Sequence, residues 1–249
     1  MKKLNYRIIA TGNVKLRLSD KPTVKIPGKK GRIIDKLWKD ILQKRGGLFN
    51  GQLLEFASVN KNGDNIHLSG NFIEYKQFIA DKKQPELKLN IKPVGVSGII
   101  IAKEDGIDYA VFARRTKEVT DYPNFLELVP SGSIDREFLL KNGDIDYRSK
   151  ILSEFSEETG LPKNYVKQIS GFALVLDASK NIYDICCTIL VKKDRATITK
   201  YFHKSKEYKN FQFVPLKDLY TFIEETDSIV PTSIALIKAY TQFTEKKSR

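Results

Sequence analysis

The sequence predicts an α/β protein, an α/β/α sandwich around a mixed sheet that is preceded by a small α+β domain. A continuous apolar run at residues 94–102 is typical of a strand that is buried on both faces. Amphipathic helical spacing occurs at residues 32–45 and again after Pro231, a residue type that often begins a helix. We therefore expect a basic α+β N-terminal domain at residues 1–92 and the sandwich at residues 93–249.

Short apolar runs between these helices predict the strands and turns. In the N-terminal domain, strands are predicted at residues 6–10, 14–18 and 23–27, and within residues 48–56 and 65–70. A basic turn is predicted at residues 28–31, and a charged linker at residues 81–92. In the second domain, strands are predicted at residues 109–113, 174–176, 185–191 and 211–214, and a loop at residues 127–132.

The composition is that of an ordinary globular protein, with 41% hydrophobic and 29% charged residues among 249. No apolar run approaches the length of a membrane span, so no membrane association is expected. The two cysteines, Cys186 and Cys187, are adjacent within an apolar run, which favours buried thiols over a disulfide or a metal pair. These features predict a cytoplasmic protein.

The net charge of +13 is concentrated in the N-terminal third of the chain. Residues 1–93 contain 20 Lys and Arg against 8 Asp and Glu, whereas residues 94–249 contain 23 against 22. Such asymmetry is typical of proteins that bind nucleic acid or other anions. A lysine-rich surface that serves solubility is an equally good explanation. Nucleic acid is therefore one expected partner of the N-terminal domain, with solubility as the alternative.

An acidic cluster occupies the segment 151–161. Glu154, Glu157 and Glu158 are spaced i, i+3 and i+4, so an α-helix places them on one face. Three neighbouring carboxylates repel one another unless a cation neutralises them, and a hard divalent cation prefers oxygen ligands. Gly160 is predicted to end the helix. A solvated acidic helix face is the alternative for such spacing taken alone.

The preceding context favours the metal site. Residues 125–135 form a short apolar strand that ends in Pro-Ser-Gly and leads towards the acidic helix. Together the segments resemble the box of the Nudix hydrolases, G-x5-E-x7-R-E-U-x-E-E-x-G-U, where U is a bulky aliphatic residue. Residues 153–161 match its second half with only the leading arginine replaced, and Gly132 is the box glycine by context. Asp144 and Asp146 are weak stand-ins for the mid-loop glutamate.

Beyond the box, the sequence is similar to the Nudix subfamily typified by the animal UDP-glucose/UDP-galactose hydrolase. The short features that carry this similarity lie at residues 49–51, 112–119, 122–123, 130–132, 207–214 and 231–233. The resemblance implies a small-molecule nucleotide substrate, a UDP-sugar that is hydrolysed to UMP and a sugar 1-phosphate. The alternatives are ADP-ribose, a dinucleotide or a capped RNA end, and a Nudix domain without catalysis that binds a nucleotide or a partner. A homodimer formed through the N-terminal domain is also implied.

The resemblance assigns metal ligands to this chain. Glu154 and Glu158 are the expected ligands of Mg²⁺, with Mn²⁺ as an alternative ion, and Glu157 contributes directly or through water. The backbone carbonyl of Ser131 is the expected fourth ligand. Gly132 lets the chain approach the metal without an intervening side chain.

The resemblance also assigns catalytic and substrate-binding roles. Glu154 and Glu157 are the expected catalytic residues of the box. Glu207, just before a predicted strand, is the expected general base, and an exposed loop glutamate is the alternative for it. Arg115 suits a phosphate oxygen, because guanidinium binds phosphate bidentately. Arg114 is a second candidate for substrate binding, with a surface role as its alternative.

Two features depart from the family pattern. Ser153 stands where the box has the arginine that orients its glutamates, and the interval between the glycine and the helix carries an insertion within residues 135–148. Two consequences of the missing arginine are open: slow turnover, or compensation by Arg148 or Lys150 nearby.

Overall fold

The computed structural model describes residues 5–21, 26–44, 47–119, 121–202, 205 and 207–247. The strand expected at residues 23–27 lies mainly outside these ranges. Among the helices so described, none is long and apolar enough to cross a membrane.

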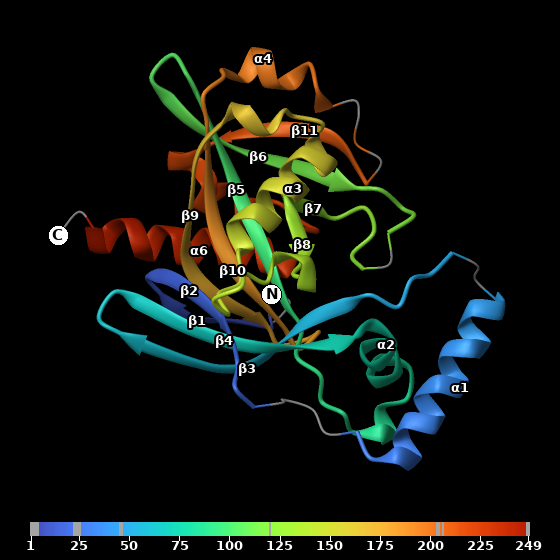
Figure 1. Cartoon of the computed structure of the whole chain (residues 1–249). Coiled ribbons are helices and arrows are strands. Elements are labelled where there is room, and N and C mark those ends of the chain that lie inside the picture. The colour runs from blue at the N-terminus through green and yellow to red at the C-terminus, as the bar shows by residue number, and fades with distance from the viewer. Residues whose placement is uncertain are drawn as a thin grey trace.

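A mixed sheet forms the centre of the molecule (Figure 1). Its strands are β1 (Tyr6–Thr11), β5 (Val94–Glu104), β6 (Ile107–Arg115), β7 (Leu126–Leu128), β8 (Ser131–Ser133), β9 (Val166–Asp177), β10 (Ile182–Val191) and β11 (Tyr208–Pro215). The order is β1-β9-β10-β5-β6-β11, with β7 beside β6 and β8 beside β5. β5 runs parallel to β10 and antiparallel to β6 and β8. Residues 94–102 are buried throughout, which confirms the predicted central strand.

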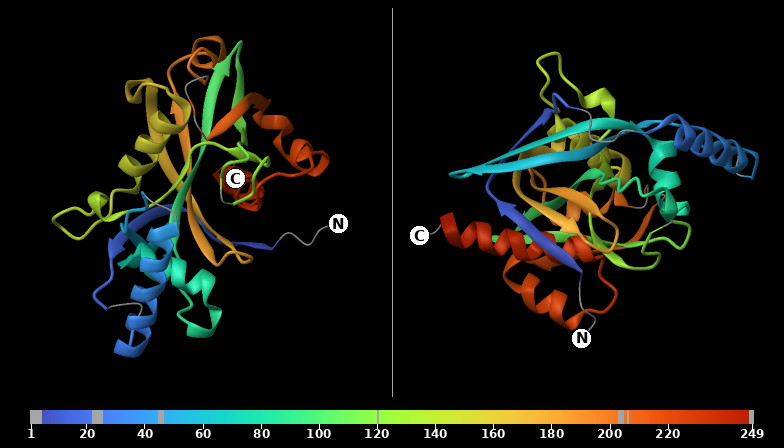
Figure 2. Two further views of the ribbon diagram at one scale, coloured as in Figure 1. Left: turned by 90° about the vertical axis from the view of Figure 1, so that its right-hand side faces the viewer. Right: turned by 90° about the horizontal axis from the view of Figure 1, so that it is seen from below.

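Helices cover both faces of this sheet, as the left view of Figure 2 shows. The helices concerned are α3 (Tyr147–Thr159), α5 (Leu219–Glu225) and α6 (Pro231–Lys247). On one face, α3 packs through Ile151 and Phe155. On the other face, α5 and α6 pack through Leu219 and Ile237. The predicted α/β/α sandwich is therefore confirmed.

A small three-stranded sheet lies beside the sandwich, together with two helices. Its elements are β2 (Asn13–Leu18), β3 (Gln52–Asn62), β4 (Asn65–Glu74), α1 (Gly28–Lys44) and α2 (Tyr75–Lys83). The strand order is β2-β4-β3, with β2 parallel and β3 antiparallel to β4. The segment predicted as a linker, residues 81–92, buries Leu87, Leu89 and Ile91 in one apolar cluster with Ile34 of α1. Its apolar residues therefore give this segment a packed core, despite its charged composition.

The small sheet shares an apolar core with the sandwich. Val14 and Leu68, from β2 and β4, belong to the same buried cluster as Ile151 of α3. β1 belongs to the large sheet, where it pairs antiparallel with β9. Whether residues 1–92 form a separate domain stays a prediction.

Two local expectations were wrong. Residues 28–31 form the first turn of α1 and not an isolated basic turn, because Gly31 N donates to the carbonyl of Pro27 at 3.0 Å and the helical hydrogen bonds continue from there. The expected loop at residues 127–132 contains parts of β7 and β8, because each pairs with a neighbouring strand of the sheet. The short helix α4 (Arg195–Thr199), capped by the Asp194 side chain, was not predicted.

A buried carboxyl group on β10 gives a pH-dependent prediction. Asp184 is 8% exposed and accepts a hydrogen bond from Ser97 Oγ at 3.1 Å. Burial raises the pKa of Asp184 to about 7, against the smaller opposing effect of the Ser97 hydrogen bond. The folded protein therefore holds this proton more tightly than the unfolded chain, whose aspartates titrate near 4. Stability is then lost as the pH rises from about 4 to about 7 and stays low above that.

We expect Asp184→Asn to stabilise the protein at pH 8, by an amount on the order of a few kcal/mol, and to have little effect at pH 4. The amide retains an acceptor for Ser97 and carries no charge to desolvate. Urea unfolding at both pH values measures the difference. Asp108→Asn, at a half-exposed aspartate paired with Lys103, serves as the control and should show no comparable pH dependence. Equal effects of Asp184→Asn at pH 4 and pH 8 would contradict the assignment.

Candidate active site

The acidic helix α3 is fixed at both ends by local hydrogen bonds. Asp146 caps its N-terminus by accepting a hydrogen bond from Ser149 N at 3.0 Å. Gly160 ends the helix in the left-handed conformation, with φ of 73°, as predicted. Ile151 and Phe155 are fully buried against the sheet. The helix therefore holds its glutamates in a fixed position relative to the sheet.

The glycine of the Pro-Ser-Gly segment lies directly against this helix. Gly132, on β8, pairs with Val96 of β5. A side chain at this position would collide with the carboxylate of Glu154. The sequence motif thus corresponds to a close contact between a strand and the acidic helix.

Glu158 is the most buried of the three clustered glutamates. Its side chain accepts a hydrogen bond from the backbone N of Ser131 at 3.1 Å, and the residue is 7% exposed. Burial raises the pKa of Glu158 well above its ordinary value, and the negative charges of Glu127, Glu154 and Glu207 raise it further. These carboxylates are thus close enough to repel one another.

Glu154 is held by a lysine from its own helix. Lys150 Nζ lies 2.7 Å from Glu154 Oε1 and 3.1 Å from Asp135 Oδ2. Burial raises the pKa of Glu154, against the opposing effect of Lys150. Lys150 therefore provides a positive charge beside Glu154, and its compensation for the missing box arginine stays a prediction. Arg148 instead stacks on the ring of Tyr147, 4.8 Å from its centroid.

Sequence reasoning missed a fourth carboxylate, Glu127 on β7. It is 7% exposed and accepts a hydrogen bond from the Tyr208 hydroxyl at 2.7 Å. It also forms an ion pair with Arg115, and Ser131 Oγ lies 3.4 Å from its other oxygen. The available signal was a single acidic residue inside the otherwise apolar run from Leu126 to Val129.

The structure gives Arg115 and Arg114 different surroundings. Arg115 is mostly buried, paired with Glu127, and donates from Nε to the carbonyl of Asp121 at 3.0 Å. Arg114 lies away from the carboxylates, and its Nη1 donates to the carbonyl of Asn124 at 2.7 Å. The side chain of Arg115 therefore belongs to the carboxylate cluster. Substrate binding by either arginine stays a prediction.

The remaining predicted residues lie at the rim of the cluster. Glu157 is exposed and accepts a hydrogen bond from Ser153 Oγ at 2.8 Å, so the serine orients a glutamate by a different contact from the box arginine. Glu207 is exposed at the start of β11, yet its charge raises the pKa of both Glu154 and Glu158. The structure thus brings Glu207 near the helix, and its role as a base stays a prediction.

The two expected stand-ins for the mid-loop glutamate do not reach the cluster. Asp144 forms an ion pair with Arg17 of β2 at 3.0 Å, and Asp146 is the N-cap of α3. Both are held by these contacts, because the insertion packs against the small sheet.

The oxygen donors of the clustered carboxylates are of the kind that a hard divalent cation binds. Their present positions are too far apart to hold one. Glu154, Glu157 and Glu158, the expected ligands, offer oxygen donors, and a cation would relieve the repulsion of Glu154 with Glu157 and with Glu158. Within the described ranges, however, no three His, Cys, Asp or Glu side chains converge closely enough to hold a metal ion. Lys150 and the backbone N of Ser131 occupy carboxylate oxygens instead.

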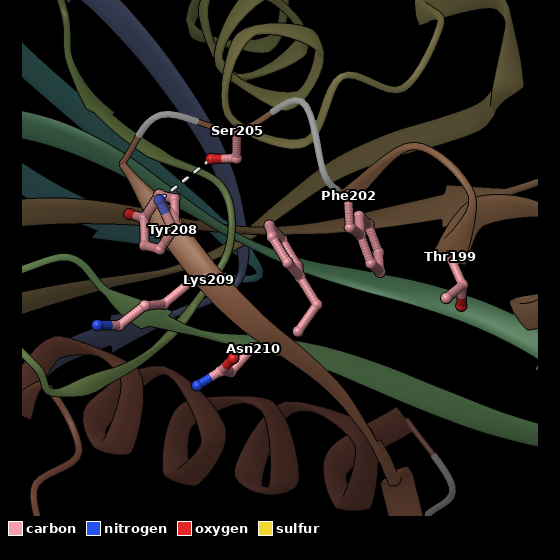
Figure 3. Close-up of a pocket in the computed structure, with 7 residues that line it drawn as sticks. Thr199, Phe202, Ser205, Tyr208, Lys209 and Asn210 are labelled. Carbon is pink, nitrogen blue, oxygen red and sulfur yellow. Dashed lines mark hydrogen bonds between the residues drawn. The ribbon is translucent and has the colours of Figure 1, made fainter.

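Tyr208, whose hydroxyl contacts Glu127, also lines a pocket of about 430 Å³, which Figure 3 shows. It is lined by Thr199, Phe202, Ser205, Tyr208, Lys209, Asn210 and Phe211. The rings of Phe202 and Phe211 stack with centroids 4.0 Å apart. Tyr208 connects the pocket to the cluster through its hydrogen bond to Glu127. The pocket therefore has an aromatic lining and a lysine, and its Tyr208 contacts one of the carboxylates.

Comparison with known proteins gives only remote similarities. No family model matches the sequence, and no curated protein sequence matches it. Solved structures that resemble the chain include DR0079 of Deinococcus radiodurans, with 11% identity over 58% of this chain and 80% of that one, and a TM-score of 0.44. Tm1382, a putative Nudix hydrolase, matches with 15% identity over 84% of this chain and 96% of that one, at a TM-score of 0.44. A C. elegans Ap4A hydrolase matches with 13% identity over 61% and 98%, at 0.38.

Proposed function

We propose that this protein is a Nudix-type pyrophosphatase that hydrolyses a nucleoside diphosphate linked to a second group. The observation that carries the proposal is the contact between Gly132 and Glu154, with Glu158 bonded to the backbone of Ser131. The acidic helix lies against the glycine strand, which supports a single site built from the two halves of the box-like sequence. This geometry and the sequence motif together support the proposal.

The residues of the cluster have distinct parts in the proposed reaction. Glu154, Glu158, Glu157 and the carbonyl of Ser131 would hold Mg²⁺, or Mn²⁺. When bound, the ion supplies positive charge that neutralises the pyrophosphate and activates water. To hold the ion, Glu154 would have to give up its contact with Lys150, and the Lys150 ammonium, still beside Asp135, would then have a position open to a phosphate oxygen.

Glu207 is the proposed base because it is exposed to water and lies near enough to affect the titration of Glu154 and Glu158. Glu127 is held by Tyr208 and Arg115, so its proposed part is to position these neighbouring groups.

A UDP-sugar is the proposed substrate, with UMP and a sugar 1-phosphate as products. The aromatic pocket beside Tyr208 supports a substrate that carries a planar base, and Lys209 offers a charge for phosphate. The aromatic lining of the pocket gives no preference for uracil over adenine. ADP-ribose, a dinucleotide and capped RNA therefore remain the alternative substrates.

The test is turnover of a substrate panel by the full chain with Mg²⁺. The panel contains UDP-glucose, UDP-galactose, ADP-ribose, Ap4A and a capped RNA, with products separated by chromatography. We expect UMP and hexose 1-phosphate from the UDP-sugars. Turnover of another substrate alone would keep the chemistry and replace the UDP-sugar assignment.

A second candidate function is nucleotide binding without hydrolysis. It is favoured by the contact of Lys150 with Glu154 and by the absence of a tight three-carboxylate group in the part of the chain that is described. Saturable nucleotide binding by calorimetry, without turnover of any panel member, would establish this alternative and overturn the proposed hydrolysis.

A further inference from the structure

The outward face of the small sheet carries polar side chains in register. β2, β4 and β3 are adjacent (Figure 1), and alternate residues of each strand point to the same side. One row across the strands is Lys15, His67 and Asn60, and the next is Arg17, Ser69 and Ser58. Leu16 and Leu68, on the opposite face, are buried in the core. The fold of the sheet therefore fixes these six polar groups on one surface.

These rows line a pocket of about 590 Å³. Ser19, Asp20 and Lys21 border it after the end of β2, and Asn142 and Gly143 also line it. Its volume is in the range of small-molecule sites, about 300–1,000 Å³. The pocket is therefore large enough for a ligand of the size of a phosphorylated sugar.

The insertion that departs from the Nudix spacing contributes to this pocket. Ile145 N donates to the carbonyl of Leu16 at 3.0 Å, and Leu18 N donates to the carbonyl of Gly143 at 2.8 Å. The ion pair between Arg17 and Asp144 fastens the same contact. The insertion thus continues the small sheet beyond β2 and places Asn142 and Gly143 beside the polar rows.

The pocket offers more positive than negative charge. Lys15, Arg17 and Lys21 line it, whereas Asp20 is the one acidic residue among its lining. Among the described residues, no other group forms a hydrogen bond or ion pair with the ammonium groups of Lys15 and Lys21, which both line the pocket. Such a concave cationic surface attracts and retains phosphate groups.

The uncharged side chains of the pocket indicate the chemistry of the rest of the ligand. Ser58 and Ser69 share a hydrogen bond of 2.8 Å and retain further capacity, and Asn60 adds an amide. No Phe, Tyr or Trp lines the pocket within the described chain, so it offers no ring for stacking a nucleobase. Hydroxyl and amide groups instead suit a ligand with several hydroxyl groups.

We propose that this pocket is a second ligand site, separate from the carboxylate cluster, which binds a phosphorylated polyol such as a sugar phosphate. Lys15 and Lys21 bind the phosphate, and Asn60 with the paired serines binds hydroxyl groups. The site is defined by the small sheet and the insertion, so it does not depend on the hydrolytic function proposed above.

The test uses glucose 6-phosphate as the probe and the full chain without added metal. Amide chemical shifts of isotopically labelled protein report the location of binding, and calorimetry reports the affinity. We expect shifts at Lys15, His67 and Ser69 and at Asn142. The double variant Lys15→Ala/Lys21→Ala is expected to weaken binding at least tenfold, and Lys61→Ala, at an exposed lysine near the end of β3, is expected to change it less than twofold.

Further measurements test the phosphate and the sugar of the ligand separately, and they test RNA as the competing class of ligand. Inorganic phosphate is expected to bind more weakly at the same residues, and glucose alone is expected not to bind. Shifts confined to α3 and β8, equal affinity in the double variant, or no binding of glucose 6-phosphate would each overturn the proposal. Tighter binding of a 12-nucleotide RNA than of glucose 6-phosphate at these residues would overturn it in favour of a nucleic-acid surface.

Discussion

Replacing Glu158 with glutamine is expected to reduce pyrophosphate hydrolysis by about 100- to 1,000-fold while it makes the metal-free protein more stable at neutral pH. Activity falls because the variant loses a buried negative charge that the proposed metal site requires. Stability rises because burial raises the pKa of Glu158, so its ionised form is unfavourable in the folded state. The same charge is therefore useful for function and costly for folding.

The sign of the stability change depends on pH. The unfolded chain ionises Glu158 near pH 4, whereas the folded protein retains the proton to a higher pH. The ionised side chain thus lowers stability progressively above about pH 4, and glutamine removes this loss. Urea unfolding with EDTA at pH 4 and pH 8 should show an advantage of the variant only at pH 8.

Glu157→Gln is the matched control for stability, because Glu157 lies on the same helix and is exposed. We expect its unfolding free energy to change by less than about 0.5 kcal/mol at either pH, as is usual for surface substitutions. Turnover by Glu158→Gln within threefold of the wild type would contradict the proposed role of this residue.

Replacing Arg115 with methionine is expected to lower the unfolding free energy by about 3 kcal/mol. The substitution leaves Glu127 buried with hydrogen bonds from Tyr208 and Ser131 but without its cationic partner. An uncompensated buried charge costs more than the lost contact itself. Equilibrium urea unfolding at pH 7 measures the effect.

Two variants distinguish the effect of breaking this ion pair from the effect of removing an arginine in general. Arg114→Met removes a neighbouring arginine that donates to a loop carbonyl, and it should cost less than about 1 kcal/mol. The double variant Arg115→Met/Glu127→Met should be more stable than the sum of its single variants predicts, because neither member of the pair is left as an unpaired buried charge. Equal losses in Arg115→Met and Arg114→Met would contradict the assigned pair.

The sequence by itself determined the parts of this protein that depend on local patterns. The apolar run at residues 94–102 specified a buried strand, since charged or polar residues do not interrupt it. The spacing of Glu154, Glu157 and Glu158 specified a shared helix face, and Gly160 specified where the helix ends. The resemblance to the Nudix box predicted that Gly132 and Glu154 lie close together, and the two residues are in contact.

Only the tertiary structure decided which distant residues meet. Glu127 joins Arg115 and Tyr208 because β7 and β11 both pair with β6, and strand pairing cannot be obtained from local spacing. The insertion before α3 contacts β2, about 125 residues earlier in the chain. Asp144 therefore forms an ion pair with Arg17 and does not reach the carboxylates. Backbone pairing and burial, which act between segments remote in sequence, thus determined the surroundings of the motif, whereas local periodicity determined the motif itself.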